Sequence, residues 1–466
     1  METTAYSKRD LTSLLICTCA ASIVVPLLST MLNLALVPIG EEFGVGSHDL
    51  GYVSTLYLLG SVVGMVPASR IASIWGMRKV LVIGLVSTAI MCLLMAVSPT
   101  FESFILFRFL GGIVSSMMLV TSVASITFVA PAEHRGWALG VNTTAVYLGL
   151  SAGPFLGGVV CDLLGWRAVP LFVLAVACVA LALSHSFKHE IVLQAGRRMD
   201  WVGTAGWGAS MMLLMFGVVN VTSAWAWPMI AAGSVVLVLE IRYLLRCDHP
   251  VFSVRMFRNK SFSAAAVASF MNYGACYSIS YFMALYLQSI GALSGTEAGV
   301  LMLIQPVFQV LLTRKAGDLY DRLPDKRTMP AVGAAVTAAG VSMFLFLGTE
   351  ADLLYVGITL AVCGIGVGLF SSPITAAIMS SVDPSDRGDA SGTVSVMRQT
   401  GMLVSMGIAM GCVSVVMGSM DGLGPATYGA FVDTIHLAFG ICLAMCVAGL
   451  LLTLVEGRRD AVRRLA

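Results

Sequence analysis

The sequence predicts an all-α protein that crosses a membrane many times. Of its 466 residues, 58% are hydrophobic and only 11% are charged, whereas soluble domains carry about 25% charged residues. Uncharged stretches recur along the chain, and most are near the roughly 20 residues that one α-helix needs to cross a bilayer. The segments between them are short loops, which leave no room for a soluble catalytic or nucleic-acid-binding domain.

The uncharged stretches give the expected membrane helices in order. They cover residues 11–39, 50–69, 80–101, 136–161, 168–187, 201–239, 261–296, 298–313, 328–349, 353–382, 399–420 and 434–455, and a further stretch, 103–129, contains one charge, Arg108. The first stretch is too long for the core of a cleavable signal, so we expect it to remain as a span. The stretch 201–239 is long enough for two helices joined by a turn at 220–228.

The distribution of lysine and arginine predicts the number and direction of the spans, because cytoplasmic loops are enriched in both. Arginines lie before the stretch 201–239 at 197–198 and after it at 242 and 246, so we expect both flanks in the cytoplasm and two crossings between them. This gives fourteen spans with both termini cytoplasmic. In that topology Arg167 is the only cation outside, and Arg108 is the only one within a span.

A short internal repeat divides the chain into two related halves. The pattern Arg135-Gly136-x-Ala138-x-Gly140 recurs as Arg387-Gly388-x-Ala390-x-Gly392, each time at the start of a span. We therefore expect a six-helix bundle in residues 1–190, an inserted transmembrane hairpin with its linkers in 191–255, and a second six-helix bundle in 256–466. Related halves around a binding site at the midplane are typical of secondary transporters, in which one bundle rocks against the other.

The expected span 136–161 carries a run of glycines and one proline: Gly140, Gly149, Gly153, Pro154, Gly157 and Gly158. Gly149, Gly153 and Gly157 are four residues apart, so they share one helix face that has almost no side chains. Such a face lets another backbone approach closely within the membrane. Pro154 removes a backbone donor and bends the helix at the same level.

Several motifs occur in an order that resembles the fourteen-span drug:proton antiporters of the major facilitator superfamily. The glycine run is similar to the antiporter motif of that family, and three other elements match it in order: Arg108-Phe109-Leu110-Gly111-Gly112, Asp200-Trp201-Val202-Gly203 and Arg398-Gln399-Thr400-Gly401. The resemblance covers essentially the whole chain. It implies an exporter of small amphipathic organic compounds that works by alternating access in the lipid bilayer of the cell membrane. It also implies a monomer without a cofactor, and protons as the candidate coupling ion.

The loop 317–327 follows the GxLxDRxGRR pattern of the cytoplasmic gate in that family. The resemblance implies a gating role for Gly317, Asp321, Arg322 and Arg327, and for Arg78 in the first-half copy of the loop. A carboxylate there accepts hydrogen bonds from a facing helix terminus, and the arginines pair across the boundary between the bundles. The first-half copy has Ser73 and Ile74 in place of the Asp and Arg. The alternative is an ordinary basic cytoplasmic loop.

The candidate substrate-binding residues are polar side chains within the expected spans. Tyr273, Tyr277 and Tyr281 recur every four residues, and tyrosines offer aromatic contact together with a hydroxyl group. The other candidates are Asn33, Asn272, Gln305, Gln309 and Arg108. A charge at mid-helix costs about 2.5–3.5 kcal/mol on insertion scales, so Arg108 is expected either in the central cavity or as an anchor at the outer surface beside Glu102.

The first span departs from the family at the position that matters most for proton coupling. Members resemble LDxTIVNVALP, whereas this chain has Leu28 at the acidic position. Glu240, Glu297 and Asp433 all lie near span ends, so we expect no carboxylate deep in the membrane. Three alternatives to a proton antiporter follow: a uniporter, an uncoupled exporter of anionic or lipid-like compounds, and a membrane sensor that does not transport.

The sequence favours neither an enzyme nor a pump. It has no HExxH motif, no nucleophile–base arrangement and no phosphate-binding Gly-x4-Gly-Lys-Ser/Thr loop. Its 11 cysteines are scattered, most of them in apolar stretches, and lack the histidines or carboxylates that would complete a metal site. We therefore expect no metal and no cofactor.

Overall fold

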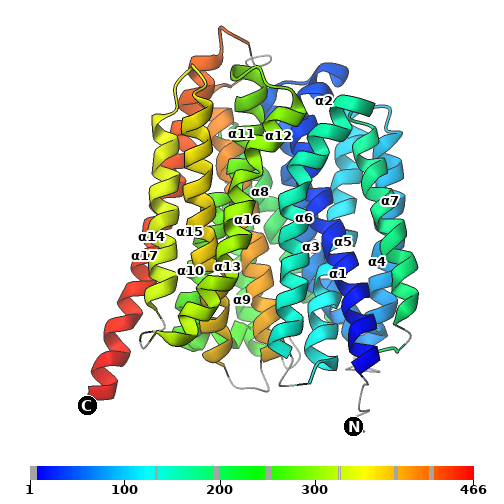
Figure 1. Ribbon diagram of the computed structural model, residues 1–466, viewed down its shortest axis with the longest axis vertical. Helices are drawn as coiled ribbons and strands as arrows, with labels where there is room; N and C mark the ends of the chain where they lie inside the picture. The colour runs from blue at the N-terminus through cyan, green and yellow to red at the C-terminus, as the bar shows by residue number, and fades with distance from the viewer. Residues whose placement is uncertain are drawn as a thin grey trace.

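The computed structural model describes residues 8–131, 135–187, 189–192, 199–247, 254–323, 325, 327–382, 387–418 and 424–465. Within these ranges the regular structure is entirely helical, which confirms the predicted all-α class. The helices stand side by side in one bundle (Figure 1). We call the end of the bundle where α1 begins and α17 ends the terminal end, and the opposite end the distal end.

The first half contains the helices α1 to α7. They are α1 (Lys8–Thr30), η1 (Met31–Ala35), α2 (Leu36–Phe43), α3 (Ser47–Trp75), α4 (Met77–Ala96), α5 (Phe101–Val129), α6 (Arg135–Leu164) and α7 (Ala168–Leu183), followed by the short turn η2 (Ser184–Ser186). The first span is broken near its middle. Pro26 removes a backbone donor within α1, and the tight 3₁₀ turn η1 separates α1 from α2.

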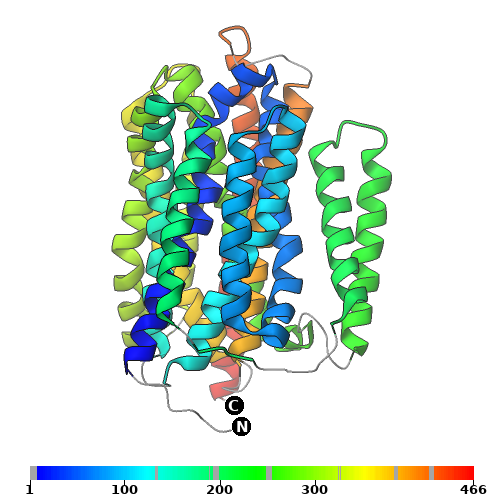
Figure 2. The same cartoon turned by 90° about the vertical axis from the view of Figure 1, so that its right-hand side faces the viewer.

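A helical hairpin follows the first half. Its helices are α8 (Trp201–Val219) and α9 (Ala226–Arg246), which are the two helices expected within one long uncharged stretch. Figure 2 shows this pair beside the main bundle. Helix α8 contacts α3 of the first half and α16 of the second half, whereas α9 packs mainly on α8. The hairpin therefore lies along the boundary between the halves.

The second half contains the helices α10 to α17. They are η3 (Val254–Arg258), α10 (Lys260–Cys276), α11 (Ser278–Leu285), the π-helical turn η4 (Tyr286–Ile290), α12 (Gly295–Met302), α13 (Ile304–Arg322), α14 (Thr328–Met343), η5 (Phe344–Phe346), α15 (Leu353–Ser380), α16 (Arg387–Val416) and α17 (Tyr428–Leu465). The expected span 261–296 is divided among α10, α11 and η4, and Tyr277 between α10 and α11 keeps helical dihedral angles.

Within the described residues, 13 helices are long and apolar enough to cross a membrane. The divided segment α10–α11–η4 is not among them, because none of its pieces reaches 18 residues. The predicted count of fourteen spans therefore remains a prediction. The position of both ends of the chain at the terminal end favours an even number of crossings (Figure 1).

The glycine run of α6 packs mainly within its own half. A methyl group at Gly149 would meet Ile23 and Pro26 of α1, and one at Gly157 would overlap the backbone of Met31 in η1. The shared small face thus receives the broken middle of the first span. The run meets the second half at Gly158, against the backbone of Gly295, and at Pro154, whose carbonyl oxygen lies against Gly299. A methyl group at Gly140 would have no described neighbour within 4 Å.

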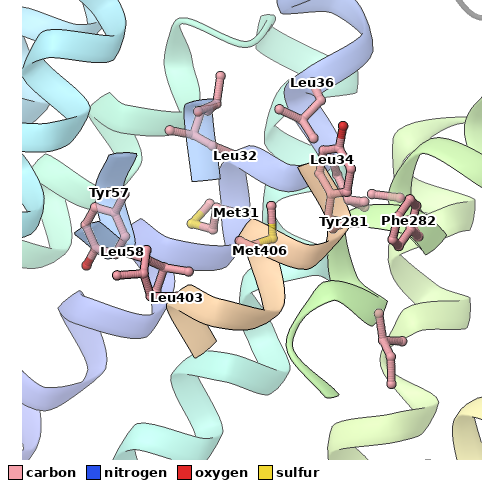
Figure 3. Packing of buried hydrophobic residues seen from close by; sticks show 14 of the residues in the cluster. Met31, Leu32, Leu34, Leu36, Tyr57, Leu58, Tyr281, Phe282, Leu403 and Met406 are labelled. Atoms are coloured by element: carbon pink, nitrogen blue, oxygen red, sulfur yellow. The ribbon is translucent and has the colours of Figure 1, made fainter. Parts of the chain in front are cut away.

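One hydrophobic cluster joins the two halves around η1. Figure 3 shows Met31, Leu32 and Leu34 of η1 together with Leu58 of α3, Phe282 of α11, and Leu403 and Met406 of α16. All seven side chains are buried, so apolar packing seals the boundary between the halves at this level.

Candidate substrate cavity between the two halves

A cavity of about 120 Å³ lies between the halves. The first half contributes Thr30 of α1 and Tyr147, Leu150 and Pro154 of α6. The second half contributes the remaining lining residues: Tyr273, Cys276, Tyr277, Ile279, Ser280, Met302, Gln305, Pro306, Gln309, Leu360, Val367 and Met402. The wall is therefore mostly aromatic and aliphatic, with hydroxyl and amide groups at a few positions.

Four of the predicted binding residues meet in this cavity: Tyr273, Tyr277, Gln305 and Gln309. The hydroxyl of Tyr277 lies 2.6 Å from Ser29 Oγ in α1, so this tyrosine also bridges the halves. The hydroxyl of Tyr273 donates to Ser371 Oγ at 3.4 Å. These two contacts fix both rings at the cavity wall.

The other four predicted binding residues do not line this cavity, and two of them, Tyr281 and Asn272, are buried away from it. Tyr277 has helical dihedral angles and joins α10, which ends at Cys276, to α11, which begins at Ser278, yet Tyr281 at the end of the expected stripe does not line the cavity. Tyr281 is fully buried and packs against Phe282, with 5.4 Å between the ring centroids. Asn272 is also buried outside the cavity, and neither polar atom of its amide has a hydrogen-bond partner among the described residues.

Asn33 lies one contact behind the cavity wall. Its amide nitrogen donates to Ser280 Oγ at 2.9 Å, and Ser280 lines the cavity. Its amide oxygen accepts from Ser54 Oγ at 2.7 Å. Asn33 therefore holds the broken first span between α3 and the second half.

Arg108 is buried in the first half and does not line the cavity between the halves. Its Nε donates to the carbonyl oxygen of Val53 at 2.9 Å, and its Nη1 donates to the carbonyl oxygen of Leu28 at 2.7 Å. The guanidinium lies 4.6 Å from the ring centroid of Tyr57. Because Arg108 is 0% exposed, the expected anchor at the outer surface beside Glu102 is wrong.

The candidate membrane span Gly392–Val416 includes Arg398, whereas the expected stretch 399–420 begins just after it. Helix α16 begins at Arg387, so Arg398 lies about 16 Å along it at 1.5 Å per residue. It lines a second cavity of about 50 Å³ with Asn142, Tyr147 and Ser395. The internal repeat could have indicated this placement. Its first copy begins a helix at Arg135 and its second copy begins a helix at Arg387, eleven residues before Arg398.

At the distal end the two halves are joined by a contact that sequence reasoning missed. The carboxylate of Asp162, in the last turn of α6, accepts from the backbone nitrogens of Gly295 and Thr296 at 3.2 and 2.7 Å and from Thr296 Oγ1 at 2.6 Å. It therefore caps α12 of the other half, beside α6 in Figure 1. An acidic residue in the last turn is unfavourable for its own helix. This unusual position of Asp162 in the sequence could have indicated a partner outside α6.

The predicted gate residues show no latch between the halves in the described contacts. Arg78 Nε donates to the carbonyl oxygen of Phe187 at 2.6 Å, and Glu190 accepts from the Arg78 backbone at 2.9 Å, so Arg78 is held within the first half. Gly317 lies against Ser372 of its own half. Arg322 is exposed, Arg327 is half-buried, and the side chain of Asp321 lies outside the described residues. The gating role stays a prediction.

Metal ligation has no support in the described part of the chain, where no group of three or more His, Cys, Asp or Glu side chains could hold an ion. The functional features described above are the two cavities, Arg108, Arg398 and the Asp162 contact at the distal end.

Comparison with known proteins agrees with this architecture. Residues 18–406 match the Major Facilitator Superfamily. The chain is 22% identical to the riboflavin transporter RibZ of Clostridioides difficile (strain 630), over 96% of this chain and 97% of that protein. It is 25% identical to the multidrug resistance protein Stp of Mycobacterium tuberculosis (strain CDC 1551 / Oshkosh), over 81% of this chain and 71% of that protein.

Solved transporters share the fold at low sequence identity. A bacterial homologue of the human lysosomal transporter Spinster, solved in an inward-facing and unoccupied conformation, superposes with a TM-score of 0.71 at 14% identity, covering 97% of this chain and 98% of that one. A POT family transporter in complex with 5-aminolevulinic acid gives a TM-score of 0.72 at 11% identity, with 96% of each chain covered. The fold, the cavity between related halves and the sequence match agree, and the chain belongs to the Major Facilitator Superfamily.

Proposed function

We propose that this transporter exports small amphipathic organic compounds across the cell membrane by alternating access. The observation that carries the proposal is the cavity to which both halves contribute. Its tyrosines and glutamines, Tyr273, Tyr277, Gln305 and Gln309, suit a ligand with an aromatic body and a few polar groups. Two relatives, a riboflavin transporter and a multidrug resistance protein, carry names that are consistent with such a substrate.

The proposed direction of transport rests on the distribution of basic residues and on the Asp162 contact at the distal end. The predicted topology places the terminal end in the cytoplasm, and the Asp162 contact joins the halves at the distal end. In this conformation the cavity would be shut off from the outside, ready to take substrate from the cytoplasm.

A second candidate is transport without proton coupling, and the cavity lining favours it. No aspartate or glutamate is among the described residues that line either cavity. Leu28 stands at the acidic position of the family, and Glu240 is buried against Gly206 within the α8–α9 hairpin instead of facing a cavity. An exchanging carboxylate of the usual kind is therefore missing from the proposed pathway.

Everted membrane vesicles test the proposal and separate the two candidates. An exporter should move compounds of a broad aromatic panel into such vesicles. In a separate measurement, Cys276 at the cavity wall should react more slowly with thiol reagents when a transported compound is bound. Uptake that is unchanged when the pH gradient is collapsed supports uncoupled transport. Folded protein that moves no compound of the panel would overturn the transport proposal and favour the sensor.

A further inference from the structure

Arg398 is a charged residue inside a helix that is long and apolar enough to cross a membrane. It lies inside the candidate membrane span Gly392–Val416 of α16, and its side chain is half-buried at the wall of the smaller cavity. Tyr147 lines both this cavity and the larger one, so the two spaces adjoin. Charged side chains within membrane helices are costly and usually face a cavity or a partner.

Among the described residues Arg398 has no ion pair and no hydrogen bond. Its guanidinium contacts the ring of Tyr273, with 5.7 Å to the ring centroid. The other two arginines discussed above differ from it. Arg167 pairs with Glu42 at 2.6 Å, and Arg108 donates to two backbone carbonyl oxygens. The donors of Arg398 are therefore available to a ligand in the cavity.

We propose that Arg398 binds the anionic group of an aromatic substrate, so that the transporter prefers aromatic carboxylates to their neutral analogues. The planar guanidinium matches a carboxylate with two parallel hydrogen bonds. Tyr147 and Tyr273 both line the larger cavity, and their hydroxyl oxygens lie 3.4 Å apart, so aromatic surface for a substrate ring lies close to Arg398. This inference rests on the proposed transport function and adds the substrate class to it.

Arg108, the arginine that the sequence singles out, fits this role less well. It is fully buried, it lines neither cavity, and two of its three nitrogens are already engaged. The lining of both cavities also has no described acidic group that would repel an anion or neutralise Arg398. The position of Arg398 is therefore the one that a substrate anion could reach.

Binding of a matched probe pair to the purified full-length transporter tests this inference. The probes are naphthylacetic acid and naphthylacetamide, which share the ring and differ in charge, with dissociation constants measured by calorimetry. We expect wild type to bind the acid at least about ten-fold more tightly than the amide, as a charge-assisted hydrogen bond would give. Arg398→Gln should remove this preference by weakening the acid alone, and Arg398→Lys should keep part of it.

Arg167→Gln is the matched control, because Arg167 pairs with Glu42 and lines neither cavity, and it should leave both affinities unchanged. Three results would overturn the inference: equal affinity of wild type for both probes, equal weakening of both by Arg398→Gln, or no binding of either. Arg398-dependent binding without movement into vesicles would contradict the transport function alone. Equal transport of both probes by wild type and Arg398→Gln would contradict the role of Arg398 alone.

Discussion

At the scale of single residues, Arg108 shows how a membrane arginine is satisfied without an acidic partner. Two backbone carbonyl oxygens and the Tyr57 ring surround its guanidinium, while Nη2 has no hydrogen-bond partner among the described residues. One of those carbonyls belongs to Leu28, the position where an acid is expected by resemblance. The sequence predicted that both residues are unusual, but only the structure places them in contact.

A double-mutant cycle tests that contact. Leu28→Asp should be tolerated, because Arg108 lies beside residue 28 and can neutralise the new carboxylate. Arg108→Gln should cost roughly 1–3 kcal/mol more in the Leu28→Asp background than in wild type. Thermal unfolding of the purified protein measures it, with Leu28→Asn as the uncharged control. Additive effects would show that the introduced carboxylate does not interact with Arg108.

The glycines of α6 give a second prediction at this scale. Gly157→Ala would push a methyl group into the Met31 backbone and should destabilise the protein by about 1–3 kcal/mol, as overpacking does. Gly140→Ala is the matched control, because nothing lies within 4 Å of the new methyl group, and it should be neutral or slightly stabilising. Both are compared by thermal unfolding, and equal melting temperatures would contradict the assigned packing.

At the scale of helices, the sequence predicted which faces are small and which segments are apolar, but not which helix covers which face. The spacing of Gly149, Gly153 and Gly157 predicted a close approach, and the approaching partner is the broken first span of the same half. Counting charges placed the start of the thirteenth span after Arg398, because a charge was taken as the mark of a loop. The helix continues past it, since a cavity admits a polar group inside the membrane.

Removing the cap that Asp162 places on α12 tests whether this contact holds the distal end closed. Asp162→Ala removes three accepted hydrogen bonds across the boundary, and should widen the distances between spin labels placed on the distal ends of α6 and α12. Asp352→Ala is the control, because Asp352 caps α15 within the second half through Leu354 and Tyr355. Each change should cost about 0.5–2 kcal/mol of stability. Equal label distances in both variants would show that Asp162 does not hold the distal end shut.

At the scale of the whole molecule, composition and the internal repeat predicted the membrane class and the paired halves, because both depend on patterns that repeat along the chain. The sequence also supplied four residues of the cavity wall, Tyr273, Tyr277, Gln305 and Gln309. It missed Tyr147, Asp162 and the placement of Arg398. These roles depend on how the two halves meet, and contacts between segments far apart in sequence leave no local pattern.

Transport through a protein whose distal end is locked is the most direct test of alternating access. The variant Asp162→Cys/Thr296→Cys puts two thiols where side chains of the two halves now touch, at 2.6 Å between Asp162 Oδ2 and Thr296 Oγ1. The single variants, treated with the same oxidant, control for loss of the cap and for the native cysteines. We predict that oxidation stops transport, that reduction restores it, and that probe binding persists throughout. Undiminished transport by the fully cross-linked protein would contradict the account.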